Sequence, residues 1–303
     1  MKIAILSNGN ANYSTKRLKA VAEQRGHEVK VIKYKNCWGS IDHDDPIIEY
    51  RGKTVEGYDA IIPRIAVYMT RYGTTILRQL ELQGMYSVNS SLAISRSRDK
   101  LRSTQILARA GVDIPKTVVS RNASDIDGML DVLGGAPVII KLASGTHGNG
   151  VVLAETRKAA KSVLQAFYLR NEDGTNVLIQ EYIAESAGSD IRAFVVGGRV
   201  VASMKRQSLD DDFRSNLHKS GVGKTIKLTE AERKIAIKAA RVMGLNVCGV
   251  DMMRSTRGPL VLEVNASPGF GIEKVTGRDV ATPIVEYVEQ NAKRKHKKDR
   301  IGA

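Results

Sequence analysis

The 303-residue sequence is poor in cysteine and in aromatic residues, and each shortage excludes a class of protein. The two cysteines, Cys37 and Cys248, lie far apart and lack the paired spacing of a zinc site. Two cysteines also make no disulfide framework in a chain of this length, so we expect a reducing, cytoplasmic environment. Aromatic residues make up 5% of the chain, fewer than the stacking surface of a typical RNA-binding module would need.

Long hydrophobic runs are missing as well. No stretch approaches the ~18 apolar residues that crossing a bilayer requires, and Met1-Lys2 leads into only four apolar residues. The sequence therefore predicts neither a membrane span nor secretion. With 42% hydrophobic and 26% charged residues, the composition is that of a globular protein with a packed core. The length allows one large domain or two to three smaller ones, at roughly 100 to 200 residues each.

The positive charge of the chain is unevenly distributed. There are 47 Lys and Arg against 32 Asp and Glu, a formal charge of +15, and residues 291–303 hold six Lys or Arg and one Asp, a charge of +5. Such a basic tail can bind phosphate backbones, including ribosomal RNA, but it is more often a solvated chain end. Charge alone therefore does not assign a function.

The first 95 residues alternate between strand and helix patterns. Strands are expected at 2–6 and 28–34, with a helix from Ser14 to Arg25 between them, for which Ser14 suits the N-cap. This order predicts an α/β domain with a parallel sheet. The loop after the first strand has one glycine and lacks the G-x-G-x-x-G pattern, which argues against a dinucleotide site. Further elements are expected as a hairpin at 47–56 centred on Arg51-Gly52, a buried strand at 59–64, and helices at 72–83 and 91–110.

A basic stretch, SRSRDKLRS, begins at Ser95 and marks the predicted boundary between a domain of residues 1–95 and one of residues 96–290. The second domain mixes strand and helix patterns. Strands are expected at 117–120, 137–142, 151–155 and 177–183, helices at 124–133, 158–169 and 230–243, a hairpin turning at Gly197-Gly198, and two strands joined through 255–259.

The segment PVIIKLASGTHGNGV is the first candidate site. An apolar strand ends in Lys141 and is followed by Gly145, Gly148 and Gly150. Glycines let backbone N–H groups approach phosphate oxygens, and a lysine at the strand end can neutralise their charge. We interpret the segment as a phosphate lid between two antiparallel strands; a plain hairpin turn with a solvated lysine is the alternative. It is not a Walker A motif, because no Gly-Lys-Ser/Thr follows.

Oxygen-bearing side chains near the end of the chain form the second candidate site. Strand alternation puts Glu263 and Asn265 on one face, and a hairpin turn at Arg257-Gly258 would place Asp251 opposite them. Mg²⁺ prefers such oxygen ligands in combination with substrate phosphates. The apolar neighbours of Glu263 predict a buried position, where an unpaired carboxylate would be costly, so we favour a metal ligand over an exposed acid.

Two further segments carry weaker signals. In VLIQEYI, an apolar strand ends in polar residues whose backbone groups could bind an adenine edge, with Asp190 shortly after for ribose hydroxyls; a strand with a polar end is also commonplace. In KRQSLDDDFRSNLHKSG, Arg206 and Arg214 could clamp a triphosphate or a substrate carboxylate, whereas a solvated charged loop is the alternative. His218 in this segment has no partner visible in the sequence.

In combination, the segments KIAIL, RDKLRS, the glycine loop, QEYI, DFRSNLH and EVNASPG resemble the ATP-grasp superfamily, and more closely its RimK branch of glutamate ligases. The resemblance covers nearly the whole chain, and DFRSNLH with EVNASPG is its specific part. It implies an α/β (α+β) chain with a pre-ATP-grasp domain (1–95), an ATP-grasp domain (96–290) and a basic tail (291–303). Within the ATP-grasp domain it implies a central lid (about 96–183) and a C-terminal part (about 184–290).

The resemblance also implies roles for individual residues. Nucleotide contacts fall on Lys100, Lys141, Gly145, Gly148, Glu181, Tyr182, Asp190, Arg214, Ser215 and Asn216. The ligands for two Mg²⁺ ions, for which Mn²⁺ could substitute, are Asp251, Glu263 and Asn265, and the groups for substrate carboxylates and catalysis are Arg192, Arg206 and Arg214. After SPG, the segment Phe270–Glu273 is one residue shorter than the RimK spacing, a departure that bears on acceptor or amino-acid selectivity.

The implied chemistry is carboxylate activation by ATP through an acylphosphate, followed by attack of an amine. Such phosphoryl transfer is served mainly by positioning and charge neutralisation. In the RimK group L-glutamate supplies the amine, and the acceptor is the C-terminus of a small-subunit ribosomal protein. A cytoplasmic homo-oligomer, dimer or tetramer, is expected. Related ligases act on a carrier protein in lysine biosynthesis, on coenzyme side chains or on small peptides, and a basic nucleic-acid-binding module is the alternative from another class.

Removing residues 291–303 distinguishes the ligase from the nucleic-acid-binding module. We expect the truncated protein to retain ATP turnover on a free peptide acceptor, because the tail contains none of the predicted site residues. Affinity for ribosomal RNA, measured by filter binding at two salt concentrations, should fall if the tail contacts phosphates. Loss of ATP turnover on the free peptide would contradict the ligase interpretation.

Overall fold

A parallel sheet forms the N-terminal part of the computed structural model, which describes residues 1–9, 11–43, 46–142, 150–169, 176–186, 188–208 and 222–293. The strand order is β2-β1-β5-β6, with β1 at Lys2–Leu6, β2 at Glu28–Ile32, β5 at Ala60–Pro63 and β6 at Tyr86–Ser87. All neighbouring pairs are parallel, which confirms the predicted sheet. The helices of this part are α1 (Tyr13–Gln24) and α2 (Thr70–Leu82), and short 3₁₀ segments lie at Tyr34–Asn36 and Val67–Met69.

One local prediction in this part is wrong. Helix α1 begins after Asn12, so Ser14 lies inside the helix instead of capping it, and its Oγ accepts a hydrogen bond from Arg64 at 3.1 Å. The chain does turn at Arg51 and Gly52, which have φ values of 55° and 69°. The predicted hairpin is confirmed, because Glu49 and Thr54 form an antiparallel bridge and the Val55 N–H donates to the Ile48 carbonyl at 2.7 Å. The strand before the turn, β4 (Ile47–Tyr50), also pairs along its length with β3 (Cys37–Ser40), a strand that the sequence did not predict.

The predicted helix over residues 91–110 is two helices, α3 (Ser91–Arg98) and α4 (Lys100–Arg109). Asp99 separates them with an extended backbone, φ −85° and ψ 102°, and its side chain accepts a hydrogen bond from the Arg102 N–H, as an N-cap residue does. The break changes the direction of the chain between Arg98 and Lys100. Arg98 therefore donates to the Ile65 carbonyl in the N-terminal part, whereas Lys100 donates to the Leu142 carbonyl of strand β8 (Val138–Leu142).

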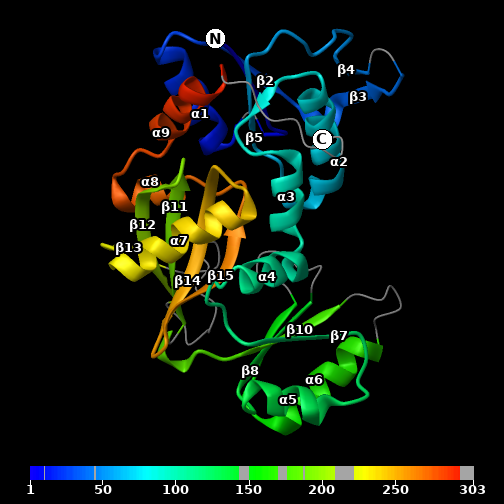
Figure 1. The fold of residues 1–303 in the computed structure, drawn as a ribbon, viewed down its shortest axis with the longest axis vertical. Coiled ribbons are helices and arrows are strands. Elements are labelled where there is room, and N and C mark those ends of the chain that lie inside the picture. The colour runs from blue at the N-terminus through cyan, green and yellow to red at the C-terminus, as the bar shows by residue number, and fades with distance from the viewer. Residues whose placement is uncertain are drawn as a thin grey trace.

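A small antiparallel sheet lies at the far end of the molecule from the N-terminal sheet (Figure 1). Its order is β7-β10-β8-β9, from β7 (Thr117–Ser120), β10 (Val177–Glu181), β8 and β9 (Val151–Ala154). Helices α5 (Ile126–Leu133) and α6 (Arg157–Leu169) share its apolar core. Strands β8 and β9 are antiparallel neighbours, as predicted for the strands on either side of the glycine loop.

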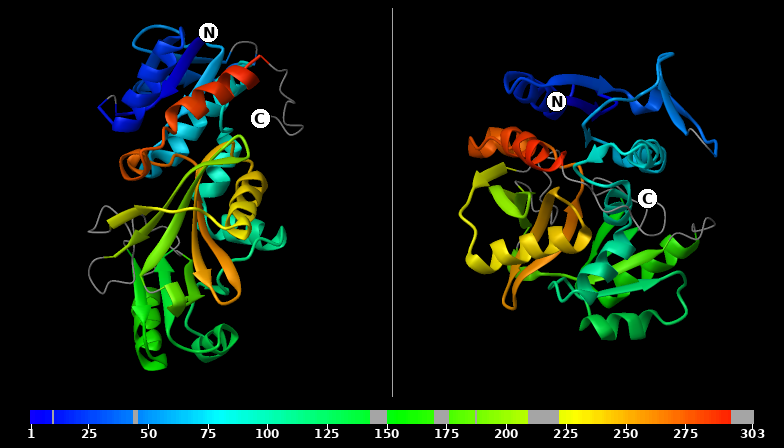
Figure 2. Two further views of the ribbon diagram at one scale, coloured as in Figure 1. Left: turned by 90° about the vertical axis from the view of Figure 1, so that its left-hand side faces the viewer. Right: turned by 45° about the horizontal axis from the view of Figure 1, so that its top comes forward.

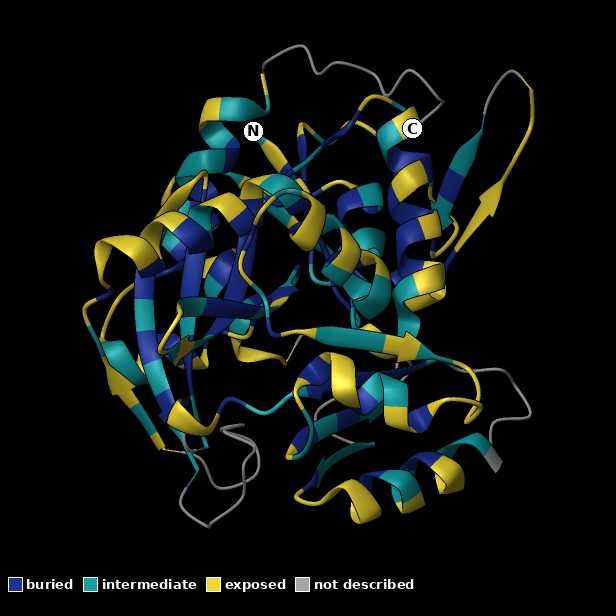
Figure 3. Ribbon diagram, turned by 60° about the horizontal axis from the view of Figure 1, so that its bottom comes forward, coloured by how far each residue is buried: buried dark blue, intermediate teal, exposed yellow. Residues whose placement is uncertain are grey.

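The central antiparallel sheet lies between these two parts (Figure 1). Its order is β13-β12-β11-β14-β15, from β13 (Val222–Thr225), β12 (Arg199–Gln207), β11 (Ser189–Val196), β14 (Val247–Ser255) and β15 (Gly258–Asn265). A short 3₁₀ segment, Ala184–Ser186, precedes β11. Helix α7 (Glu230–Met243) has the bounds expected from the sequence, because Thr229 and Glu232 form a capping box and Gly244 ends the helix at φ 74°. Figure 3 shows buried residues concentrated along these strands and exposed ones on the outer helix faces.

The C-terminal helices return to the N-terminal part. After α8 (Gly271–Thr276), helix α9 (Ala281–Asn291) packs against α1, and both views of Figure 2 show it alongside the N-terminal sheet. One apolar cluster joins residues of β1, β11 and α9, so the parts share a core. Arg25 adds a bidentate pair to Glu289, at 2.8 and 2.7 Å, and His27 lies 2.7 Å from the same carboxylate.

The part of the chain that the structure describes contains no helix with both the length and the apolar composition needed to cross a bilayer. The mixture of helices with one parallel and two larger antiparallel sheets confirms the predicted α/β (α+β) class.

Replacing Glu289 with Gln tests the attachment of α9. Hydrogen bonds from Arg25, and then from His27, lower the pKa of Glu289 to about 2, against roughly 4.3 in an unfolded chain. Because the folded pKa is the lower one, the stabilisation is complete above about pH 5 and is lost as the pH falls toward 2. We expect Glu289→Gln to lower the free energy of unfolding by about 1 kcal/mol at pH 7, since solvent screens the partly exposed pair.

Urea unfolding at pH 7 and pH 3.5 measures this difference, which should shrink at the lower pH. The matched control is Glu23→Gln on α1, because the Glu23 pair with Lys19 is longer, at 3.6 Å, and more exposed. An equal effect of both substitutions would contradict the role given to Glu289.

Candidate active site

A row of charged side chains crosses one face of the central sheet. The strand register places Asp190 on β11 opposite Arg206 on β12, Arg192 on β11 opposite Asp251 on β14, and Asp251 opposite Glu263 on β15. Asp190 and Arg192 are two residues apart on one strand, so their side chains share a face. Opposite charges therefore meet on neighbouring strands, where cross-strand pairs stabilise each other.

Asp251 is the centre of this row and is only 2% exposed. Arg192 binds it with two parallel hydrogen bonds of 2.6 and 2.5 Å, and the Nη2 of Arg206 lies 3.0 Å from its Oδ2. Burial alone would raise the pKa of Asp251, but the charges of the two guanidiniums outweigh burial and hold the pKa well below its usual range. Asp251 is therefore ionised in the folded protein at neutral pH.

Arg206 and Asp190 extend the row on the other side of Asp251. The Arg206 Nε donates to Asp190 at 2.6 Å, its Nη2 donates to the second oxygen, and both side chains are buried. Burial would lower the pKa of Arg206, but Asp251 and Asp190 raise it above its ordinary value. Arg192 and Arg206, predicted to bind substrate carboxylates, thus bind carboxylates of the protein itself, and Asp190, predicted to contact ribose, is engaged by Arg206. These three roles stay predictions.

The structure brings the three predicted metal ligands together. The Asn265 Nδ2 donates to Glu263 Oε1 at 2.9 Å and lies 3.3 Å from Asp251 Oδ2. The predicted burial of Glu263 is wrong, because its side chain is exposed. The cause is a register shift, in which Asp251 pairs with Glu263 but Met252 pairs with Val261. The extra residue in β15 lets Val261 and Val264 both enter the core while Glu263 faces outward.

Two lysines lie near Glu263 from other elements. The Lys100 Nζ, at the start of α4, donates to the Leu142 carbonyl at 3.3 Å, and the Lys141 Nζ on β8 donates to the Gln180 side chain. Burial lowers the pKa of Lys141 to about 8; the Glu263 carboxylate opposes this and the charge of Lys100 adds to it. Burial also lowers the pKa of Lys100. An anionic ligand placed between the two lysines would relieve their repulsion.

The predicted adenine segment lies at the end of β10. The Glu181 carboxylate accepts hydrogen bonds from the Lys116 N–H, at 2.6 Å, and from Arg257, and the Glu181 N–H donates to the Lys116 carbonyl at 3.1 Å. Tyr182 follows and is partly exposed. The side chain of Glu181 therefore fixes the connection to β7, and its contact with adenine stays a prediction.

Several predicted nucleotide residues lie outside the described residues. They are Gly145 and Gly148 of the glycine loop, and Arg214, Ser215 and Asn216 of the DFRSNLH segment, together with His218. Residues 294–303 of the basic tail also lie outside the described residues.

The donor set fits a hard divalent cation. Asp251 and Glu263 supply carboxylate oxygens from adjacent strands, and Asn265 supplies an amide that presents its oxygen after a half-turn of the side-chain amide. Within the described ranges, no group of three or more His, Cys, Asp and Glu residues is arranged to hold a metal. Substrate phosphates and water would complete the coordination, as is usual for Mg²⁺.

Sequence reasoning missed two residues near this site, Arg64 and Arg98, and predicted no side-chain role for Gln180. Arg98 lies within the basic stretch that was interpreted as a domain boundary, and its position next to Lys100 was the available signal. Gln180 precedes Glu181 and bridges two strands, since its Nε2 donates to Thr117 at 2.8 Å while its Oε1 accepts from Lys141. Arg64 had no signal in the sequence, because its partners are distant along the chain.

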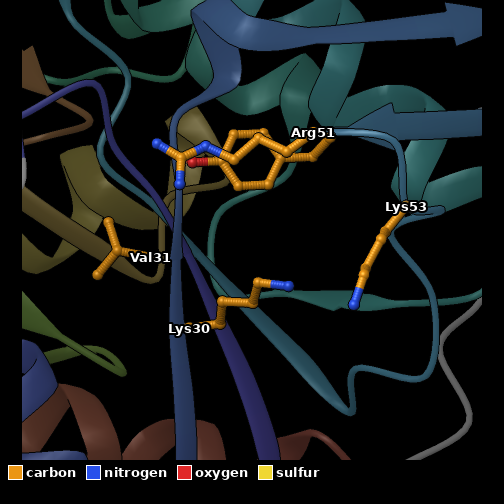
Figure 4. Close-up of a pocket in the computed structure, with 5 residues that line it drawn as sticks. Lys30, Val31, Arg51 and Lys53 are labelled. Atoms are coloured by element: carbon orange, nitrogen blue, oxygen red, sulfur yellow. The ribbon is translucent and has the colours of Figure 1, made fainter.

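Two open cavities lie elsewhere, on the N-terminal part. One, of about 330 Å³, is lined by Lys30, Val31, Tyr50, Arg51 and Lys53, and in Figure 4 the lysine side chains extend into it. The Arg51 guanidinium lies 5.4 Å from the Tyr50 ring centre. The other, of about 410 Å³, adjoins it along β2 and α1. Neither lining includes a carboxylate, so neither offers the ligands that the charged row provides.

Comparison with solved structures defines the class of protein. Over 96% of this chain and 99% of that chain, the fold matches the ATP-grasp ligase PsnB complexed with a minimal precursor, with a TM-score of 0.73 and 19% identity. A RimK domain protein from Sphaerobacter thermophilus matches with a TM-score of 0.70 and 19% identity over 95% and 100% of the two chains. The D-cycloserine synthetase DcsG matches with a TM-score of 0.73 and 17% identity over 97% and 100%. The fold is that of the ATP-grasp ligases.

Sequence comparison assigns the family. The family model described as a RimK-like ATP-grasp domain matches residues 97–288, and that of the RimK PreATP-grasp domain matches residues 1–94. The chain belongs to the RimK-like ATP-grasp family and is an ATP-dependent ligase. It is 54% identical over 301 residues to a protein of Vibrio cholerae and 55% identical over 302 residues to one of Picosynechococcus, covering 99% of each chain. Both relatives are named probable alpha-L-glutamate ligases.

Substitutions at Asp251 and Glu263 separate metal binding from stability. Asp251→Asn leaves Arg192 and Arg206 buried without their shared carboxylate, so we expect a loss of about 3 kcal/mol in the free energy of unfolding. Glu263→Gln, at an exposed position, should cost less than about 0.5 kcal/mol. Both should weaken the binding of Mn²⁺ in the presence of ADP at least tenfold, as measured by electron paramagnetic resonance. Unchanged Mn²⁺ binding by Glu263→Gln would exclude Glu263 as a ligand.

Proposed function

We propose that the protein is an ATP-dependent ligase that adds L-glutamate, through an amide bond, to the C-terminal carboxylate of a protein acceptor. The observation that carries this proposal is the 54% identity, over 99% of both chains, with a probable alpha-L-glutamate ligase. The cationic surroundings of Glu263 support it. The Glu263 carboxylate acts to raise the pKa of Arg98, Lys100 and Lys141, so all three cations lie near it and together suit an anionic substrate.

The proposed reaction proceeds in two steps. An oxygen of the acceptor carboxylate attacks the γ-phosphorus of ATP, the bond from that phosphorus to the β–γ bridging oxygen breaks, and ADP leaves. The neutral amine of glutamate then attacks the acyl carbon of the acylphosphate. Phosphate leaves, the amine gives up a proton to solvent, and the net products are the amide, ADP and phosphate.

The residues of the chain serve this reaction by position and charge. Lys100 and Lys141 extend from different elements toward one region and would neutralise phosphate oxygens. Arg192 and Arg206 hold the carboxylate of Asp251 in a fixed orientation. Asp251, Glu263 and Asn265 would hold Mg²⁺, as two ions or with Mn²⁺ in its place, and the metal would supply charge neutralisation at the phosphates.

The acceptor is proposed to be a small-subunit ribosomal protein, on the basis of the RimK resemblance. Solved neighbours are compatible with a peptide acceptor, since PsnB was determined with its precursor peptide PsnA2 and AMPPNP, and the macrocyclase MdnC with its precursor MdnA. The proposal includes a cytoplasmic homo-oligomer, a dimer or tetramer, with weak ribosomal RNA contact through residues 291–303. A carrier protein, a coenzyme side chain or a small peptide would be the acceptor in related ligases.

Mass spectrometry tests the proposal directly. The purified enzyme is incubated with cell extract proteins, ATP, Mg²⁺ and glutamate, and intact protein masses are compared with a reaction lacking ATP. We expect one small basic protein to gain the mass of one or more glutamate residues at its C-terminus, with release of one ADP for each residue added. Parallel reactions contain lysine, aminoadipate or cysteine. Turnover with one of these and not with glutamate would reject glutamate as the substrate.

A further inference from the structure

Arg64 and Arg98 lie where the order of the parallel sheet reverses. From β1 the chain runs through α1 to β2 on one side, whereas β5 lies on the other side of β1. Ligands of open α/β sheets bind beside the carboxyl ends of the strands at such a point. Arg64 directly follows β5, and Ser14 at the start of α1 contacts it.

Arg64 is held by neutral groups. Its Nη2 donates to the Pro268 carbonyl at 2.7 Å and to the Ser14 Oγ at 3.1 Å, and its guanidinium carbon lies 5.2 Å from the centre of the Phe270 ring. No carboxylate of the described residues forms an ion pair with it. Burial, followed by the charge of Arg98, lowers the pKa of Arg64 to about 10, so two cations lie near each other.

Arg98 is also held by a neutral group and is incompletely bonded. Its Nη2 donates to the Ile65 carbonyl at 3.0 Å, but its Nε is buried and has no hydrogen-bond partner within the described ranges. Burial lowers the pKa of Arg98, and the carboxylate of Glu263 partly opposes this from a distance. Arg98 is therefore close enough to both Arg64 and Glu263 for their charges to interact.

The other arginines of the site differ from Arg64 and Arg98 in having carboxylate partners. Arg192 and Arg206 each form bidentate pairs with a carboxylate of the protein, so their charges are compensated. Arg64 and Arg98 are half-buried and have no such partner among the described residues, and a partly desolvated cation without a counter-ion is costly. Two such arginines side by side favour the binding of an anionic group of a substrate.

We propose that Arg64 and Arg98 together bind a carboxylate group of the non-nucleotide substrates. The planar guanidinium presents paired N–H donors that match a carboxylate, and both arginines are partly exposed. The ATP phosphates have separate cations, because Lys100 and Lys141 lie on α4 and β8, on the side of the small sheet. This inference rests on the proposed function and extends it to a substrate subsite.

The carboxylate can come from either of two substrates, the incoming glutamate or the C-terminus of the acceptor. Both subsites would lie beside the Ser267-Pro268-Gly269 turn after β15, because Arg64 is bonded to Pro268 and the metal ligands lie at the end of β15. Substrate selection therefore depends on contacts between the N-terminal sheet and this turn.

The test uses Arg98→Gln and Arg98→Lys, with Arg96→Gln on the same helix as the matched control. Arg96 forms no hydrogen bond or ion pair within the described residues. We expect Arg98→Gln to raise the KM of one carboxylate substrate about 10- to 100-fold, because a charged hydrogen bond to it is lost. Arg98→Lys should restore part of the loss, and the KM for ATP should stay within about twofold. Arg64→Lys, which keeps the charge but not the paired donors, should raise the same KM.

Calorimetric titration without nucleotide provides a second readout and identifies the source. L-glutamate, an acceptor peptide with a free C-terminus and the same peptide as its C-terminal amide are titrated separately into the full-length protein and each variant. Weaker binding of glutamate alone assigns the subsite to glutamate. Weaker binding of the free-acid peptide, with the amide unaffected, assigns it to the acceptor. Either result supports the proposal.

Other results would overturn the inference. Unchanged binding and KM values for both carboxylate substrates in Arg98→Gln, with lower thermal stability, would show that Arg98 is paired within the protein. An equal loss for ATP and for the carboxylate substrates would show a general disturbance of the site. Failure of the proposed function is distinguishable from both, since it appears as absence of glutamate-dependent ADP release in the unsubstituted protein.

Discussion

The pairing of Asp251 with two arginines is the interaction on which the site depends. A carboxylate that is 2% exposed can stay ionised only if positive groups replace the water it loses, and Arg192 and Arg206 do so from neighbouring strands. Arg206 also binds Asp190. The side chains of Asp190, Arg192, Arg206 and Asp251 therefore hold one another in place across β11, β12 and β14. Glu263 lies at the exposed end of the row, and its negative charge acts on Arg98, Lys100 and Lys141. Among the described residues, cations thus exceed carboxylates where an anionic substrate would bind.

The break at Asp99 connects this row to the rest of the molecule. In a continuous helix over residues 91–110, Arg98 and Lys100 would be two residues apart, with their side chains about 200° apart around the helix axis. The extended backbone of Asp99 instead directs Arg98 to the Ile65 carbonyl and Lys100 to the Leu142 carbonyl. The packing of α9 on α1 fixes the N-terminal sheet against the C-terminal residues, so that Arg64 meets Pro268. The candidate site is therefore assembled from the parallel sheet, the small antiparallel sheet and the central sheet.

The fold and the substrate are decided by different residues. Solved ATP-grasp structures that share this fold at 16–19% identity include the ligase PsnB, a D-cycloserine synthetase and a ligase determined with a leader and core peptide. The chain therefore shares its architecture with proteins that are described by different substrates, and selectivity must come from side chains that vary on the same scaffold. In this protein the contacts between the edge of the parallel sheet and the turn after β15 are suited to that role, because both border the charged row without forming part of it.

The sequence by itself determined the elements with complete local signals. Helix α7 carries its own capping box and terminal glycine, the β11–β12 hairpin its Gly197-Gly198 turn, and the alternation on β15 the common face of Glu263 and Asn265. The motif order was also sufficient to indicate the family. Tertiary structure alone decided the pairing of β4 with β3, the exposure of Glu263, the engagement of Arg192 and Arg206 with Asp251, and the position of Arg64. These features depend on contacts between residues distant in sequence, and propensity and periodicity describe only the residues near each position.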